Sequence, residues 1–120
     1  MSTRALKLKA AGAVLHGYSR DTNEVEKLNF PTFSIGTYAQ DQGPRGKVID
    51  YNVPIEINGI RITPGDIVYG DRDGVLIIPK EIEKEAFEGA IGKARGEQLV
   101  KEALEAGMST VDAFDKFGIM

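Results

Sequence analysis

The residue pattern on either side of Asn58-Gly59 constrains the fold of this 120-residue chain more than any other feature. Apolar residues alternate with other residues at the two-residue period of a half-buried strand. They are Val53, Ile55 and Ile57 before the dipeptide, and Ile60 and Ile62 after it. Asn-Gly is typical of a two-residue hairpin turn, which would place Ile57 opposite Ile60. The sequence therefore predicts a β-hairpin at this point.

Further strands are expected on both sides of the hairpin. Short apolar runs predict strands at Ala13–Leu15, Thr32–Ile35, Asp66–Tyr69 and Val75–Ile78. Within the first of these runs, Val14 and Leu15 are apolar on both faces, as in a strand inside a sheet. Polar segments at Gly17–Asn23 and Tyr38–Lys47 are expected to be a turn and a loop.

Helices are expected at the two ends of the chain. A short helix, capped by Ser2 or Thr3, would run through Leu6–Ala11 and stop at Gly12. After Pro79 the apolar residues follow a helical period, which predicts a long helix ended by Gly107. Ser109 with Asp112 resembles a capping arrangement for a last helix at Thr110–Phe117. The fold class is therefore α/β, a compact β-rich sheet core flanked by helices.

Composition and charge exclude several classes of function. The chain is 42% hydrophobic and 28% charged, with a net charge of −3 and both signs interspersed. A nucleic-acid surface needs a clustered basic face, so no nucleic-acid partner is expected. No apolar stretch approaches membrane-spanning length, and no signal peptide is recognisable, so a cytoplasmic location without membrane contact is expected. The absence of cysteine excludes thiol chemistry.

The Arg20-Asp21 pair carries the most chemical interest. It follows the first apolar strand, where α/β folds often place binding loops. A guanidinium suits a carboxylate, and an Asp offers a hard oxygen to Mg²⁺, which commonly keeps several waters. The pair can therefore hold a 2-oxo acid and a metal. The alternative, more frequent for adjacent Arg and Asp, is a solvated ion pair at a strand end.

Three other motifs favour structural interpretations. Asp71-Arg72-Asp73-Gly74 lacks the ligand count of a calcium loop and predicts a hairpin turn. Gly43-Pro44-Arg45-Gly46-Lys47 lacks the spacing of a phosphate loop and predicts a flexible loop, from which Arg45 could still reach an anionic substrate at a subunit boundary. His16, the only histidine, is a weak candidate for a general base. A histidine at the end of a strand more often has a structural role.

Several segments, in order, resemble the RraA-like family, which includes the regulator of ribonuclease E activity and the 4-hydroxy-4-methyl-2-oxoglutarate/4-carboxy-4-hydroxy-2-oxoadipate aldolases. The matching segments are Ala10–Val14, Gly17–Asp21, Phe30–Phe33, Asn52–Ile55, Pro64–Asp66, Gly70–Val75, Ile78-Pro79 and Ala113–Met120. The resemblance implies a swivelling β/β/α-like fold. It also implies that the chain corresponds to the C-terminal portion of the family.

The resemblance also implies a function. Arg20 would bind the pyruvyl part of a small 2-oxo acid, and Asp21 would help to hold Mg²⁺ or Mn²⁺. The metal would stabilise the enolate formed when a 4-hydroxy-2-oxo acid is cleaved to pyruvate, and oxaloacetate decarboxylation would be a natural second activity. The alternative is a non-catalytic regulator that binds a protein partner such as a ribonuclease.

Two departures from the family pattern affect these expectations. The position before Gly17 is usually Asp, and here it is His16. The family's N-terminal half supplies a glycine-rich loop and an acidic residue in the outer shell of the metal site, and Met1 lies too close to Arg20 to include either. We therefore expect residues 1–120 to form a single, N-terminally truncated domain. Family members form trimers or hexamers, so a homo-oligomer is expected, with Glu97 a weak candidate for an acid contributed across subunits.

Overall fold

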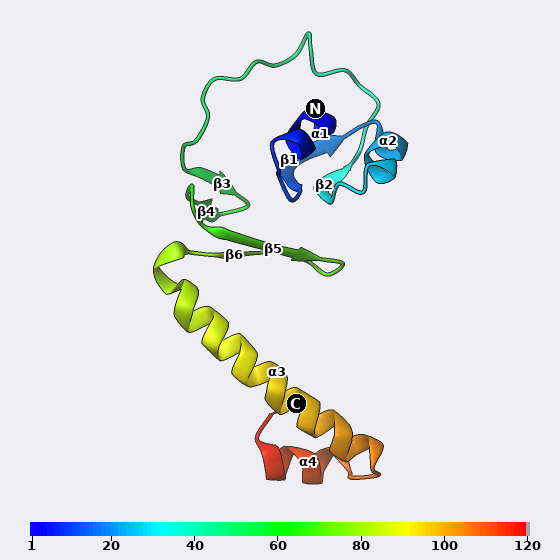
Figure 1. Ribbon diagram of the computed structural model, residues 1–120, viewed down its shortest axis with the longest axis vertical. Coiled ribbons are helices and arrows are strands. Elements are labelled where there is room, and N and C mark those ends of the chain that lie inside the picture. The colour runs from blue at the N-terminus through cyan, green and yellow to red at the C-terminus, as the bar shows by residue number, and fades with distance from the viewer. Residues whose placement is uncertain (120) are drawn as a thin grey trace. The chain divides into compact units, whose positions relative to one another are not determined.

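A computed structural model describes residues 1–119. Met120, the last residue of the family-like segment Ala113–Met120, lies outside the described residues. The chain forms two compact units (Figure 1). The first spans Met1–Ile77 and the second begins at Ile78. The family resemblance predicts one domain over the whole chain.

The first unit begins with a parallel strand pair and a crossover helix. α1 (Ser2–Lys7) precedes β1 (Ala13–Ser19), and α2 (Thr22–Lys27) connects β1 to β2 (Thr32–Thr37). The strands pair in parallel, from Ala13 opposite Thr32 to Ser19 opposite Thr37. Parallel neighbours require a crossover connection, usually a helix. The turn predicted at 17–23 is therefore wrong, because β1 continues through Ser19 and α2 begins at Thr22.

The first helix is also shorter than predicted. It ends at Lys7 rather than at residue 11, and Lys9 adopts a left-handed backbone with φ 64°. Gly12 does not stop the helix. A Cβ atom at this position would lie 2.7 Å from the carbonyl oxygen of Pro31, so Gly12 instead permits close approach of the segment before β2.

Two hairpins complete the first unit. β3 (Ile55–Ile57) and β4 (Ile60–Ile62) are antiparallel with Ile57 opposite Ile60, which confirms the predicted register. Asn58 and Gly59 adopt φ values of 49° and 80°, as a two-residue turn of this type requires. β5 (Ile67–Asp71) and β6 (Gly74–Ile78) form the other pair, so the predicted hairpin at residues 71–74 is also confirmed.

The second unit is helical. A short 3₁₀ turn, η1 (Lys80–Ile82), leads into α3 (Glu83–Glu105), and α4 (Thr110–Phe117) packs against α3. The side chain of Ser109 accepts a hydrogen bond from the N–H of Asp112, and its hydroxyl donates to the Asp112 carboxylate at 2.7 Å. The predicted capping arrangement is confirmed. Val100 and Ala113 are the buried apolar residues among the described residues of this unit, 78–119.

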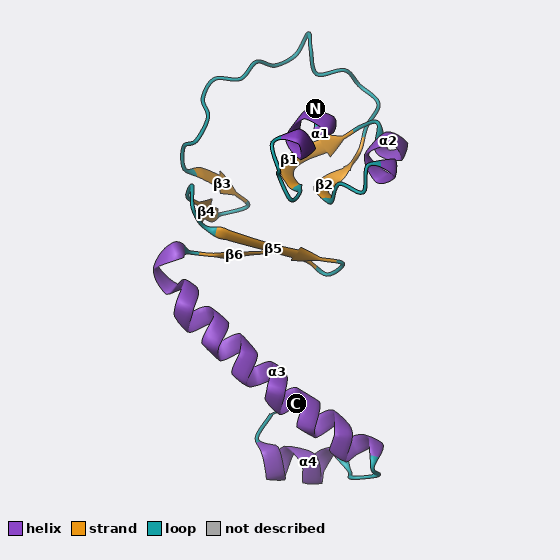
Figure 2. Cartoon of the chain, viewed as in Figure 1, coloured by secondary structure: helices purple, strands orange, loops and turns teal. Residues whose placement is uncertain are grey.

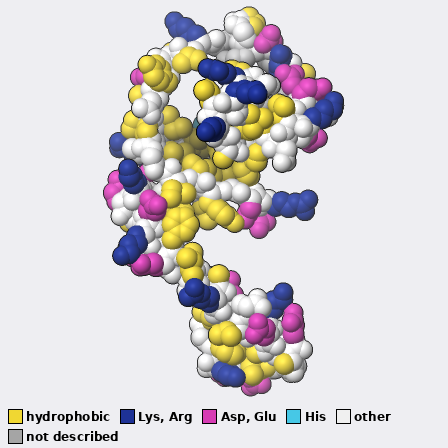
Figure 3. All heavy atoms as spheres, viewed as in Figure 1, with side chains coloured by type: hydrophobic (Ala, Val, Ile, Leu, Met, Phe, Trp, Pro, Cys, Tyr) yellow, Lys and Arg dark blue, Asp and Glu magenta, His cyan; other side chains and the backbone are white. Residues whose placement is uncertain are grey.

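The α/β class is confirmed, but the strands form three separate two-stranded sheets rather than one sheet (Figure 2). Val14 and Leu15 are 38% and 40% exposed, so the prediction of a buried first strand is wrong for the described residues. Parallel sheets are usually covered on both faces, and β1 has only β2 beside it. Hydrophobic side chains are accordingly visible on the surface of each unit (Figure 3). No helix within residues 1–119 has the length and apolar character to cross a membrane.

Candidate functional site

The candidate site lies where the two parallel strands end. Ser19, the last residue of β1, shares a hydrogen bond with the hydroxyl of Ser34 on β2 at 3.1 Å. The N–H of Tyr38, the first residue after β2, donates to the carbonyl oxygen of Ser19 at 2.9 Å. These bonds fix the two strand ends to each other. Arg20 is thereby held beside the loop that follows β2.

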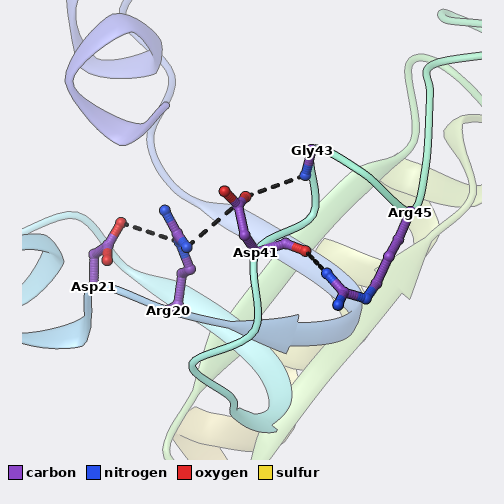
Figure 4. A network of polar contacts seen from close by, with 5 residues as sticks. All are labelled: Arg20, Asp21, Asp41, Gly43 and Arg45. Atoms are coloured by element: carbon purple, nitrogen blue, oxygen red, sulfur yellow. Dashed lines mark hydrogen bonds and ion pairs between the residues drawn. The ribbon is translucent and has the colours of Figure 1, made fainter.

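Arg20 and Asp21 lie close together in the structure. The Nε atom of Arg20 is 3.6 Å from Oδ2 of Asp21. Asp21 is the N-cap residue of α2, yet its side chain makes no capping hydrogen bond, and its backbone is left-handed with φ 59°. Asp tolerates this conformation better than most residues. The Asp21 carboxylate therefore faces the Arg20 guanidinium instead of the helix terminus (Figure 4).

A second carboxylate, Asp41, reaches Arg20 from the loop after β2. Its Oδ1 atom is 3.8 Å from Nη1 of Arg20 and accepts a hydrogen bond from the N–H of Gly43 at 3.1 Å. The guanidinium of Arg45 donates to the main-chain carbonyl of the same Asp41 (Figure 4). Sequence reasoning placed Asp41 in a loop and gave it no role. The structure makes it the residue that connects both arginines.

The four charged residues line one open groove of about 1430 Å³ in the first unit. The predicted candidate His16, exposed on β1, lines the same groove. Apolar side chains from α2 and the segment after it contribute Val25, Leu28 and Phe30. The groove exceeds the roughly 300–1,000 Å³ of typical small-molecule sites. It therefore has room for a small acid together with bound water or further protein atoms.

Glu97, the other predicted candidate, belongs to the second unit. It lies on α3, where its carboxylate is 3.6 Å from the ammonium group of Lys93, one helical turn earlier. Its side chain is about half exposed. The described contacts assign Glu97 to a helix-surface ion pair, and its role across subunits stays a prediction.

Comparison with known proteins identifies the family. The family model described as RraA-like, Aldolase/RraA, matches residues 1–77. The chain belongs to the RraA-like family. This confirms the resemblance carried by the ordered sequence segments, and the matched region contains Arg20, Asp21, Asp41 and Arg45.

Several relatives support the assignment. A Halalkalibacterium halodurans protein named "Putative 4-hydroxy-4-methyl-2-oxoglutarate aldolase" is 40% identical over 105 residues, which are 88% of this chain and 48% of that protein. Protein DlpA of Legionella pneumophila is 32% identical over 94% of this chain and 18% of its own length. The crystal structure of an uncharacterized protein from Pseudomonas syringae pv. tomato matches with a TM-score of 0.86 at 29% identity, covering 94% of this chain and 56% of that one.

The chain thus spans about half the length of the Halalkalibacterium relative and a smaller share of DlpA. Relatives from Bacillus cereus and Burkholderia mallei carry the same aldolase name as the Halalkalibacterium protein.

Proposed function

We propose that this chain provides the keto-acid and metal site of a divalent-metal-dependent lyase that cleaves 4-hydroxy-2-oxo acids to pyruvate. The observation that carries the proposal is a single guanidinium, Arg20, between the carboxylates of Asp21 and Asp41 in an open groove. Membership of the RraA-like family and the aldolase names of its relatives support the same chemistry.

In this proposal Arg20 binds the pyruvyl end of the substrate. A guanidinium has several N–H donors in one plane, which suits the adjacent carboxylate and carbonyl oxygens of a 2-oxo acid. The two ion pairs of Arg20 engage its Nε and Nη1 atoms, at 3.6 and 3.8 Å. These distances are long for charge-assisted hydrogen bonds, which are about 2.7–2.9 Å. The Asp contacts are therefore loose enough for a substrate carboxylate to replace them.

The donor set around Arg20 fits a hydrated hard cation. Mg²⁺ is usually held through one or two carboxylates and keeps several waters. Asp21 supplies one such carboxylate, and its side chain is 67% exposed, which leaves room for water. Residues 1–119 contain no cluster of three or more His, Asp or Glu side chains that could enclose a metal. Mg²⁺ or Mn²⁺ would be held by Asp21, mostly through its bound waters, and would polarise the oxygens of the keto acid.

The residues of the chain then have distinct parts in the reaction. The 4-hydroxyl group loses its proton, the bond between C3 and C4 breaks, and C3 gains a proton to give pyruvate and a carbonyl product. Arg20 stabilises the negative charge that develops on the pyruvyl oxygens. His16 lines the same groove and is a candidate to accept the hydroxyl proton. Decarboxylation of oxaloacetate develops the same charge, so we propose it as a second activity.

The test is pyruvate release from a 4-hydroxy-2-oxo acid and from oxaloacetate, coupled to lactate dehydrogenase, with Mg²⁺ or Mn²⁺ and after chelation. We expect chelation, or Asp21→Asn, to lower kcat/KM by about 100-fold, since the Lewis-acid contact is worth several kcal/mol. Asp73→Asn, in the turn between β5 and β6, is the matched control and should retain full activity. Activity that is insensitive to both chelation and Asp21→Asn would refute the proposal.

A further inference from the structure

The turn between β3 and β4 carries a reactive dipeptide that the proposed function does not use. The chain contains four asparagines, and only Asn58 is followed by glycine. In such a pair the backbone nitrogen of the glycine can attack the side-chain amide carbon of the asparagine. Glycine allows the closest approach, because it has no Cβ atom to obstruct the attack. The dipeptide that sets the hairpin register is therefore also a candidate site of covalent modification.

Both reacting groups are accessible in the structure. Asn58 and Gly59 are exposed. Among residues 1–119, neither the side chain of Asn58 nor the N–H of Gly59 forms a hydrogen bond. A Cβ atom built on Gly59 would have nothing within 4 Å beyond its two chain neighbours. In the described part of the chain, no contact therefore restrains the two groups or excludes water from the turn.

The hairpin is weak, so the turn can open. β3 and β4 have three residues each, and among the described strands they pair only with each other. An isolated two-stranded hairpin is marginally stable at best in water. Packing adds little, because Ile55 and Ile60 are 50% and 55% exposed. The closed turn fixes the backbone of Asn58 at φ 49°, and each opening frees this residue to rotate toward the geometry of attack.

We propose that Asn58 is a self-modification site, at which the chain converts this asparagine to aspartate and isoaspartate without an enzyme. The nitrogen of Gly59 loses its proton to hydroxide and bonds to the side-chain amide carbon of Asn58. The amino group on that carbon takes a proton from water and leaves as ammonia, so a cyclic imide remains. Water then opens the imide at either carbonyl, which gives aspartate or isoaspartate. The reaction requires no oxidant, reductant or cofactor.

The isoaspartate product changes the hairpin. Its main chain runs through the former side-chain carbon, so the turn gains one backbone atom. The native turn places Ile57 opposite Ile60 through successive positive φ values at Asn58 and Gly59. A lengthened turn cannot keep this arrangement, and the new carboxylate adds one negative charge. We expect the isoaspartate form to lose the register of β3 and β4.

The first test follows the mass of each asparagine-containing peptide while the unmodified chain is incubated at mildly alkaline pH. Asn52 is the matched internal control, because it is also exposed and has φ 56°, but Val53 follows it. A β-branched side chain crowds the backbone at that position. We expect Asn58 to deamidate about tenfold or more faster than Asn52, at a rate that rises with hydroxide concentration. Equal rates at the two positions, or no mass change at Asn58, overturn the proposal.

The second test measures the structural consequence with two variants. Asn58→Gly suits the same turn and lacks the reacting amide, and fresh Asn58→Asp carries the new charge on an unaltered main chain. An isoaspartate methyltransferase detects isoaspartate by methyl transfer. The Hα–Hα nuclear Overhauser effect between Glu56 and Arg61, which are partners in the hairpin, reports the register.

We expect only the incubated, unmodified chain to accept methyl groups and to lose the signal between Glu56 and Arg61 in proportion. Asn58→Gly should keep this signal after the same incubation, and fresh Asn58→Asp should show it as well. An incubated chain without isoaspartate, or an isoaspartate form that keeps the signal, overturns the inference. Equal loss in fresh Asn58→Asp would assign the change to charge and would also overturn the role of the lengthened turn.

Discussion

Replacing Asp41 with Asn tests whether this residue positions Arg20. Asn has nearly the same shape and keeps the side-chain oxygen that accepts the N–H of Gly43. The main-chain carbonyl that receives Arg45 is also kept. The substitution therefore removes one negative charge 3.8 Å from Nη1 of Arg20 and leaves the turn intact.

The size of the effect follows from distance and exposure. Two unit charges 3.8 Å apart attract by about 1 kcal/mol in water and by several times more at an effective dielectric constant near 20. The side chains of Arg20 and Asp41 are 46% and 67% exposed, so the water-like limit applies. Measured exposed pairs contribute about 0.2–1 kcal/mol. We therefore expect Asp41→Asn to change the binding of a monocarboxylic 2-oxo acid by no more than about fivefold.

The measurement is the affinity for 2-oxopentanoate, with the melting temperature recorded in parallel. Asp50→Asn is the matched control, because Asp50 is exposed and bonds only locally, to the N–H of Tyr51. A measurable change in Asp41→Asn but not in Asp50→Asn supports positioning. A loss greater than about 30-fold would refute the reasoning, because an exposed ion pair cannot supply that energy. Asp41 would then have to contact the ligand or the metal directly.

Three substitutions test local contacts within each of the two units, and the free energy of unfolding is measured by chemical denaturation. Ser109→Ala removes the N-cap of α4 and should lower the free energy of unfolding by about 1 kcal/mol. A variant as stable as the unmodified chain would contradict the role of the cap. Gly70→Ala places a Cβ atom 2.6 Å from the ring of Phe33 and should lower the free energy of unfolding by about 1–3 kcal/mol, and unchanged stability would contradict this steric conflict. Gly89→Ala, inside α3 with open space around the new Cβ, should stabilise by about 1 kcal/mol, and a loss would reveal a contact on that face.

Local chemistry made some elements predictable from the sequence. The register of β3 and β4 follows from Asn58-Gly59, because few other dipeptides accept two successive positive φ values. The start of α4 follows from Ser109, whose side chain supplies the bond that a helix terminus needs. In both cases, the residues that determine the structure are neighbours in sequence.

The elements that were predicted wrongly depend on distant partners. α2 arises where β1 must cross over to reach a parallel neighbour, and the polar residues between them do not indicate this. The partial exposure of Val14 and Leu15 depends on which layers cover the sheet. An apolar run indicates that a strand can be buried, but the covering layer lies elsewhere in sequence.

The same distinction applies to the site. Arg20 and Asp21 are adjacent, so their pairing could be inferred from sequence alone. Asp41 lies far from them along the chain, and it approaches Arg20 only because β1 and β2 run in parallel and end opposite each other, at Ser19 and Thr37. A signal for it existed. The loops after neighbouring parallel strands meet at one edge of the sheet, so the polar residues that follow Thr32–Ile35 are candidates to lie near Arg20.

The geometry of the site must therefore be maintained mainly by the backbone. Both ion pairs of Arg20 are exposed, and each is worth less than about 1 kcal/mol, too little to hold a long side chain against its rotamer entropy. The hydrogen bond from Tyr38 to Ser19 and the bond between the hydroxyls of Ser19 and Ser34 act on the strand ends themselves. They set where Arg20 and the loop after β2 begin, whichever rotamer the arginine adopts. In the proposed site the charges would then select the ligand, while the parallel strand pair would determine where it binds.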